Sequence, residues 1–110
     1  MNDDGVLVAW VTTVGNAHDA QRLAHGAVEA RLAACAQISR IDSVYRWQGA
    51  VEEAAEWRLL FKTTAGRSAA LQAWLKQRHP YELPAIFGLT VAQADAAYAA
   101  WVVESVTRQG

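Results

Sequence analysis

Two prolines enclose a short segment that brings together an imidazole, a phenol and a carboxylate. The segment is His79-Pro80-Tyr81-Glu82-Leu83-Pro84. Each proline forces the residue before it out of the helical region, so the segment should form a rigid, extended corner. An apolar core does not require polar groups in this arrangement, and the corner is therefore the first candidate site. The His79 imidazole can ligate a metal ion or anchor a ligand, and the Tyr81 hydroxyl can hydrogen-bond one.

Two neighbouring cations extend this candidate site. Arg78 places a fixed positive charge beside His79, which disfavours a cation there and favours a carboxylate or phosphate. Lys62 lies on the polar face of an alternating strand, where it can line a cleft or pair with Glu56. Structural roles are the alternatives: His79 caps a helix C-terminus, whose dipole favours the protonated imidazole, Tyr81 packs against another subunit, and Lys62 is an ordinary surface charge.

A catalytic site is the rival interpretation. Cys35 and His79 would form a thiol catalyst only if the thiolate were accessible and the imidazole lay within hydrogen-bonding reach. The strand pattern around Cys35 favours a buried, inert thiol instead. His18 and His25 are seven residues apart on one predicted helix, which does not match the spacing of three or four that a helical metal pair needs. We therefore predict no catalytic residue, and His79 as the one metal-ligand candidate.

Seven elements must position these residues. Apolar and polar periodicities predict strands and helices in the order strand, helix, strand, strand, helix, strand, helix. The expected ranges are 6–14, 16–34, 35–48, 56–64, 66–78, 85–91 and 93–106. This order predicts an α+β fold, a ferredoxin-like βαββαβ sandwich whose antiparallel sheet carries both main helices on one face.

The second and third strands should form a hairpin with a turn at Gly49-Ala50 and with Glu52 and Glu53 near its tip. This hairpin is longer than a four-stranded sheet can pair along its length, so its edges require a partner strand. The final helix is expected to carry an apolar stripe. Its residues are Ala94, Ala97, Tyr98, Trp101 and Val102.

Composition restricts the class of protein. The 110 residues fit one domain, 1–110, and 53% of them are hydrophobic. Five tryptophans are many for a chain this small, so part of the apolar surface should be buried against other subunits. A net charge of -1 argues against a nucleic-acid binder, including a ferredoxin-like RNA binder that would use Tyr45 and Trp47.

Location is predicted from three further features. The start, Met1-Asn2-Asp3-Asp4, is acidic and lacks the basic region of a signal peptide. No run approaches 18 apolar residues, so no membrane span is expected. The single Cys35 cannot form an internal disulfide, which is consistent with a reducing compartment. We predict a cytoplasmic protein.

The order and spacing of several short motifs resemble those of the CutA family of divalent-ion tolerance proteins. The matching pieces run in order across most of the chain. They are Arg31-Leu32-Ala33-Ala34-Cys35, Ser43-Val44-Tyr45-Arg46-Trp47-Gln48-Gly49, Glu56, Lys62-Thr63-Thr64, His79-Pro80-Tyr81, Pro84, Tyr98 and Trp101.

The resemblance implies a ferredoxin-like subunit in a compact homotrimer, with long hairpins pairing across subunits and an architecture similar to PII signalling proteins. It implies a role in tolerance of copper and other divalent ions, copper binding in some members, and no generally established reaction. On this basis the ligand site is expected in an inter-subunit cleft, and a divalent cation such as copper is the candidate cofactor. The site residues would be Arg78, His79, Tyr81 and Lys62.

Three positions depart from what metal-binding members of the family carry. Thr12 stands where such members have a Cys, Arg78 where a second His can stand, and Ala85 where a Glu usually follows the second proline. None of the three replaces the missing ligand. We therefore expect weak or nonspecific copper binding. The alternative function is a PII-like signalling or interaction scaffold that binds an anion. In either case the trimer should unfold above the range of about 45–65 °C typical of mesophile domains.

Overall fold

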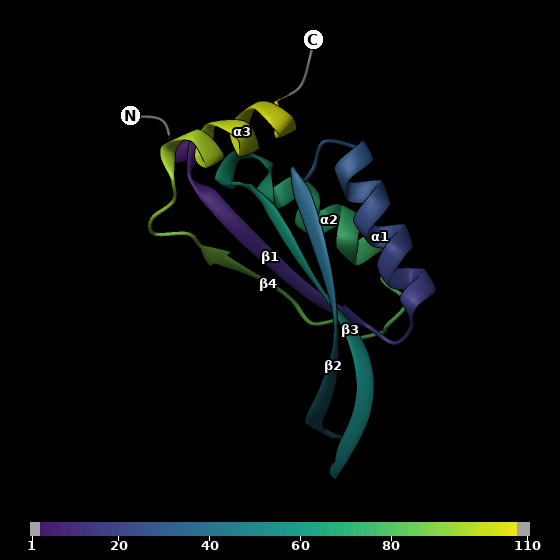
Figure 1. Cartoon of the computed structure of the whole chain (residues 1–110). Coiled ribbons are helices and arrows are strands. Elements are labelled where there is room, and N and C mark those ends of the chain that lie inside the picture. The colour runs from purple at the N-terminus through teal and green to yellow at the C-terminus, as the bar shows by residue number, and fades with distance from the viewer. Residues whose placement is uncertain (1–2, 108–110) are drawn as a thin grey trace.

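The computed structural model describes residues 3–107, and Met1 and Asn2 of the acidic start lie outside that range. Eight elements follow one another along the chain (Figure 1). They are η1 (Asp3–Gly5), β1 (Leu7–Val14), α1 (Ala17–Glu29), β2 (Cys35–Trp47), β3 (Ala50–Thr64), α2 (Ala65–Arg78), β4 (Ile86–Thr90) and α3 (Ala96–Val106).

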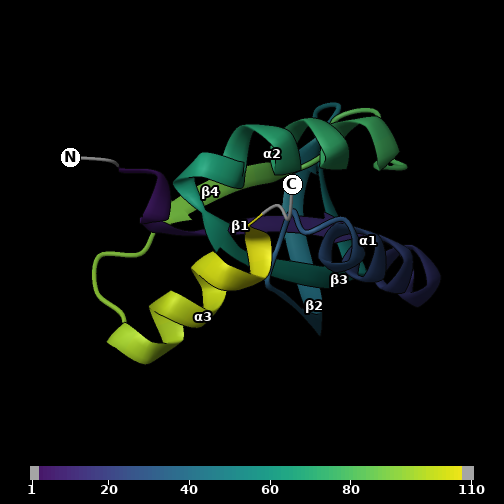
Figure 2. The same ribbon diagram turned by 90° about the horizontal axis from the view of Figure 1, so that it is seen from above.

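The four strands form one antiparallel sheet in the order β2-β3-β1-β4. This confirms the predicted α+β fold and the ferredoxin-like arrangement, in which the two outer strands are β2 and β4. Helices α1 and α2 pack on one face of the sheet. Helix α3 lies on the opposite side from α2 in the view from above (Figure 2). Its placement agrees with the strand alternation, because Phe61 faces the core while the next residue, Lys62, points toward Tyr98 of α3.

The main core lies between the sheet and the first two helices. Apolar residues recur on α1 at helical spacing and on β3 at every second position, so each element turns one face inward. The fully buried members are Val14, Ala20, Leu23, Ala27, Leu59, Phe61, Leu71 and Leu75. Small alanines on α1 allow that helix to lie close against the strands, as its Ala-rich pattern predicts.

Helix α1 begins as predicted but ends earlier. Asn16 caps its N-terminus by accepting a hydrogen bond from the Asp19 amide at 2.8 Å. The predicted range extended to residue 34, whereas the helix ends at Glu29. The chain turns because Arg31 adopts a left-handed conformation with φ of 58°, and the Leu32 amide then donates back to the Ala27 carbonyl.

The hairpin of β2 and β3 extends past the rest of the sheet. Strand β1 pairs with β3 only as far as Trp57, whereas the pairing of β2 with β3 continues to Trp47 opposite Ala50. Figure 1 shows this arm projecting beyond the other elements. The prediction of an overlong hairpin is confirmed. The turn itself is Gln48-Gly49, both with positive φ, so β3 begins at Ala50 and not at residue 56.

The predictions for α3 are partly wrong. The helix begins at Ala96 and not at residue 93, because Asp95 caps it by accepting from the Tyr98 amide at 3.0 Å. Its buried residues are Val102 and Val106, whereas Tyr98 and Trp101 are exposed. Of the predicted stripe, only Val102 is therefore turned inward, and Tyr98 and Trp101 face outward in the isolated chain. Across residues 3–107, none of the helices is long and apolar enough to cross a membrane.

Candidate functional site

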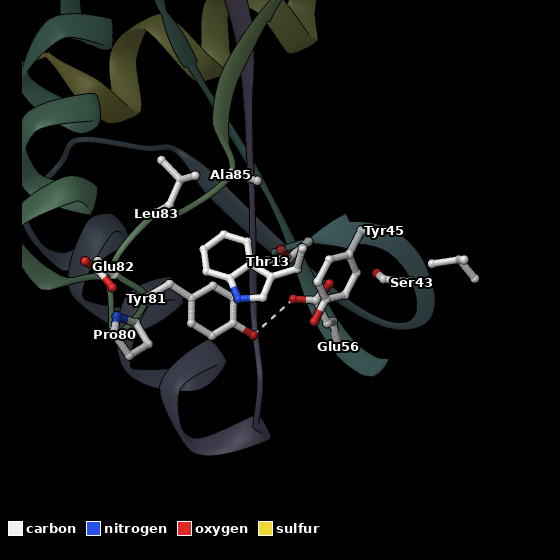
Figure 3. A pocket seen from close by; sticks show the side chains of 11 residues that line it. Thr13, Ser43, Tyr45, Glu56, Pro80, Tyr81, Glu82, Leu83 and Ala85 are labelled. Atoms are coloured by element: carbon white, nitrogen blue, oxygen red, sulfur yellow. Dashed lines mark hydrogen bonds between the residues drawn. The ribbon is translucent and has the colours of Figure 1, made fainter. Parts of the chain in front are cut away.

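A groove of about 830 Å³ opens where the hairpin leaves the sheet. Three segments line it: the end of β1, the arm formed by β2 and β3, and the loop that joins α2 to β4 (Figure 3). The loop is the predicted proline corner. Its lining residues are Thr13, Ser43, Val44, Tyr45, Trp47, Glu56, Pro80, Tyr81, Glu82, Leu83 and Ala85.

A phenol and a carboxylate join the loop to the arm. The Tyr81 hydroxyl donates a hydrogen bond to Glu56 Oε2 at 3.0 Å, which is drawn as a dashed line in Figure 3. Burial, followed by the hydrogen bond to Glu56, raises the pKa of Tyr81 to about 12. The phenol therefore remains a protonated donor near neutral pH. Gly15 leaves room for this approach, because a Cβ there would lie 3.1 Å from the Tyr81 hydroxyl oxygen, a tight contact.

His79 holds the loop in place without lining the groove itself. Its Nε2 lies 2.9 Å from the Thr13 carbonyl oxygen, and its Nδ1 accepts a hydrogen bond from the Tyr81 amide at 3.1 Å. Because Nδ1 is the acceptor, Nε2 must carry the ring proton and donate a hydrogen bond to the Thr13 carbonyl, so the imidazole is neutral.

The environment of His79 reverses one expectation from the sequence. The helix dipole was expected to favour the protonated imidazole, but burial lowers the pKa of His79, and its hydrogen bond to Thr13 only partly opposes this. Both ring nitrogens are already used, so a metal ion at His79 would have to displace one of these bonds. Within residues 3–107 there is also no group of three or more His, Cys, Asp or Glu side chains that could hold a metal ion.

The two predicted cations lie away from the groove. The Arg78 guanidinium carbon lies 4.6 Å from the centre of the Trp74 ring, and the guanidinium donates to the Trp74 carbonyl. The Lys62 ammonium lies 5.6 Å from the centre of the Tyr98 ring rather than beside Glu56. Of the four predicted ligand residues, the structure thus brings only His79 and Tyr81 together.

Two of the departing positions contact each other. The Thr12 hydroxyl is fully buried and donates to the Ala85 carbonyl oxygen at 2.6 Å. This bond connects β1 to the residue that precedes β4, so the Thr12 hydroxyl has a structural role at the position where metal-binding relatives are expected to carry a ligand. It leaves the Thr12 hydroxyl oriented toward the backbone and not toward the groove.

Cys35 and His79 do not form a catalytic pair. Cys35 pairs with Lys62, whereas His79 contacts Thr13, which pairs with Arg58. Lys62 and Arg58 are four residues apart on β3, a separation of about 13 Å at the usual rise of a strand. No general base at His79 can therefore reach the half-buried thiol of Cys35.

Sequence reasoning missed most of the groove. Glu56 was considered as a partner for Lys62, Tyr45 and Trp47 as RNA-binding aromatics, and all three as parts of the family resemblance, but none of them was assigned to the site. Glu56 and Tyr81 are 25 residues apart in the chain, and no local pattern joins them. One signal was available: Glu56 falls on a strand beside the aromatic-rich hairpin end, where a carboxylate has no packing role.

The sequence profile described as "CutA1 divalent ion tolerance protein" matches residues 8–105. This chain belongs to the CutA1 divalent ion tolerance family. The match includes all four strands and all three α-helices, except the first residue of β1 and the last residue of α3. The resemblance noted in the sequence is therefore confirmed.

Relatives of this CutA1 family member include bacterial and vertebrate proteins. The Divalent-cation tolerance protein CutA of Thermotoga maritima is 38% identical over 100 residues, covering 91% of this chain and 99% of the relative. The mouse Protein CutA is 36% identical over 110 residues, but the match spans only 62% of that longer protein. The solved structure of CutA from Synechococcus elongatus superimposes with a TM-score of 0.90 at 43% identity, covering 96% of this chain and 95% of that one.

Proposed function

We propose that this chain is a non-enzymatic, homotrimeric member of its family that acts in the response to divalent metal ions, with a small ligand held in the groove at a subunit boundary. Membership of a divalent ion tolerance family supports the biological role. The observation that carries the proposal is the projecting arm of β2 and β3. Its outer half pairs with no third strand among residues 3–107.

The surface of the arm supports association. Val44 is 66% exposed and Val51 63% exposed, and Tyr45 and Trp47 are also exposed. An extended hairpin with free edges and apolar side chains is unfavourable in water and favourable against another chain. Pairing with the arms of two further copies would cover the free edges and part of this apolar surface, and would leave the side chains that line the groove available to a ligand. A trimer with paired arms is also the reason to consider a PII-like scaffold, which would respond to the binding of a small molecule.

The absence of catalysis is also part of the proposal. Cys35 lies on β2, whereas His79 follows α2 and contacts the far end of β1. The high pKa of Tyr81 keeps its phenol protonated near neutral pH, so the phenol cannot act as a base there. We place the protein in the cytoplasm, where a single unpaired Cys35 is stable as a thiol. A metal ion at Nδ1 would displace the hydrogen bond from the Tyr81 amide, and Nε2 carries the ring proton and so has no free lone pair for the ion. Metal binding at His79 is therefore expected to be weak.

Light scattering coupled to size exclusion tests the assembly. Three chains of 12.0 kDa should give a particle of about 36 kDa, and thermal unfolding should depend on protein concentration. Trp47→Ala on the arm should shift the particle toward smaller species, since truncating an aromatic anchor commonly costs about 2 kcal/mol. Trp101→Ala on α3 is the matched control. A stable wild-type monomer at micromolar concentration would contradict the proposed trimer.

Titration calorimetry with Cu²⁺ tests the metal component. We expect no tight site in the wild-type protein, and the same weak heats in His79→Ala. One tight site per chain that disappears in His79→Ala would show that His79 exchanges its Thr13 bond for a metal ion. The divalent-ion role would then rest on direct binding and not on a response to another ligand.

A further inference from the structure

We propose that the groove binds a small organic cation, an ammonium group that carries an apolar substituent. This inference rests on the binding role proposed above and assigns the chemical class of the ligand. We propose a cation in place of the anion that the sequence suggested between Arg78, His79 and Tyr81. The Arg78 guanidinium lies over Trp74, and the Tyr81 hydroxyl is bonded to Glu56, so neither is directed at a bound anion.

The first support is the sign of the charge in the groove. Its two ionisable carboxylates are Glu56 and Glu82, and none of the described lining residues is a Lys, Arg or His. The two carboxylates come from opposite walls, Glu56 from the arm and Glu82 from the loop. An anion would be repelled by both of them, whereas a cation between the walls would be attracted by both.

The second support is an oxygen of Glu56 with no partner. Glu56 as a residue is 9% exposed, and its Oε2 accepts the Tyr81 hydrogen bond. No hydrogen bond to Oε1 occurs within residues 3–107, yet every fully buried polar side-chain atom in that range has a partner. Oε1 must therefore retain contact with solvent, and the groove that Glu56 lines provides that contact. A mostly buried carboxylate with one free oxygen is a strong acceptor for an N–H⁺ donor.

The third support is the nature of the walls. Tyr45, Trp47 and Tyr81 supply three aromatic rings to one groove, and aromatic faces attract ammonium groups. Val44 and Leu83 add apolar surface for a substituent. The volume of about 830 Å³ lies in the range typical of sites for organic molecules. A bare metal ion would need three or four ligands at short distances, and two carboxylates on opposite walls do not provide them.

A charge series on one molecular shape tests the ligand class. Benzylammonium, benzyl alcohol and benzoate share a phenyl ring and differ in charge at neutral pH. Ligand-observed NMR titrations of the full chain should show that benzylammonium binds about tenfold more tightly than benzyl alcohol, and that benzoate binds more weakly still. Equal affinities for the three probes, no binding of benzylammonium, or preference for benzoate would each overturn the proposal.

Variants locate the interaction. Glu56→Gln should reduce the preference for benzylammonium over benzyl alcohol to about twofold or less, while Glu104→Gln on α3 makes the same change of charge elsewhere and should leave the preference intact. Tyr45→Leu keeps apolar bulk on the exposed arm and removes an aromatic face, so it should weaken benzylammonium binding several-fold even if Glu56→Gln does not fold. An unchanged preference in Tyr45→Leu and in a folded Glu56→Gln would overturn the site.

Light scattering on the same samples separates this inference from the proposed function. A trimer with no preference for benzylammonium would overturn the ligand class and leave the assembly standing. A monomer that prefers benzylammonium would overturn the assembly and leave the ligand class standing.

Discussion

The two halves of β3 differ sharply although they form one continuous strand. The inner half, 57–64, pairs with β1 along its whole length and with β2 as far as Lys62, and its Leu59 and Phe61 are fully buried. The outer half, 50–56, pairs only with β2, and most of its residues are exposed until Glu56. One half holds the subunit together, whereas the other is available for contacts outside it.

This difference shows how a small chain can use one element for two purposes. Burial of Leu59 and Phe61 against α1 and α2 anchors the inner half, at about 1.5–3 kcal/mol for each large apolar side chain. The anchored half then holds the outer half in a fixed direction. Glu56 lies at the boundary between them, which is also where the groove opens.

Phe61→Ala should have the largest effect on the free energy of unfolding. The side chain is fully buried, so its removal should destabilise the protein by about 3–5 kcal/mol. Val51→Ala on the outer half should change the stability of the subunit itself by no more than about 0.5 kcal/mol, because Val51 is exposed there. Urea denaturation of both variants at one protein concentration provides the measurement.

Association of subunits would make the effect of Val51→Ala depend on protein concentration. If the arms contact other copies, Val51→Ala should lower the unfolding midpoint more at low protein concentration than at high concentration. An effect of Val51→Ala as large as that of Phe61→Ala at every concentration would mean that the outer half also belongs to the subunit core.

Gly88→Ala should have the next largest effect, at the edge of the inner region. A Cβ at Gly88 would lie 2.9 Å from the Trp10 ring, whose indole N–H is held by Ser68 at 3.0 Å. The ring cannot move without breaking that bond, so we expect a loss of about 1–3 kcal/mol in chemical denaturation. Gly5→Ala is the control, because its Cβ would make an ordinary contact of 3.9 Å with Val103. Equal stabilities of the two variants would show that the Trp10 ring can shift freely.

The fold could be predicted from the sequence because its signals are local. Asn16 as a helix cap, the alternation from Trp57 to Phe61 and the proline corner each act within a few residues. The errors occurred where a single residue decided the boundary. Arg31 ends α1 through a left-handed conformation that is uncommon for a residue with a side chain, and Asp95 rather than Gln93 begins α3.

The groove could not be predicted because long-range pairing creates it. The register of β2 against β3 places Ile41 opposite Glu56, and the loop after α2 brings Tyr81 to the same carboxylate. Neither relation has a local signature in the sequence. The positions of the two cations could not be predicted for a similar reason: the sequence shows that Arg78 ends a helix, but not that its guanidinium lies over Trp74 on the previous turn.

Tyr81→Phe tests the connection between the loop and the outer half. The substitution removes the hydroxyl and leaves Glu56 Oε2 without its donor, so we expect a loss of about 1 kcal/mol in stability. Tyr98→Phe is the matched control, since no hydrogen bond of the Tyr98 hydroxyl is present among residues 3–107. Hydrogen exchange should also accelerate in the loop 80–85 of Tyr81→Phe. Unchanged exchange there would mean that His79 alone fixes the loop.

The smallest expected effect is the pH dependence that His79 confers on stability. Burial lowers the pKa of His79 below its usual 6.5, so the folded protein binds this proton less readily than the unfolded chain does. The contribution of His79 to stability is therefore complete above about pH 6.5. It decreases as the pH falls from 6.5 toward the lowered value in the folded protein. Several charges influence this titration, namely Asp19 and Arg22 on α1 and Glu56 on β3.

His79→Gln separates this titration from the charges around it. A glutamine can accept from the Tyr81 amide and donate to the Thr13 carbonyl, as the neutral imidazole does, but it has no proton to bind in this range. Denaturation at fixed protein concentration between pH 8 and pH 5 should show a steeper loss of stability on acidification in the wild type than in His79→Gln. The loop 80–85 should open in the same interval, because a protonated Nδ1 can no longer accept the Tyr81 amide. Parallel pH profiles for the two proteins would show that the neutral imidazole does not hold the loop.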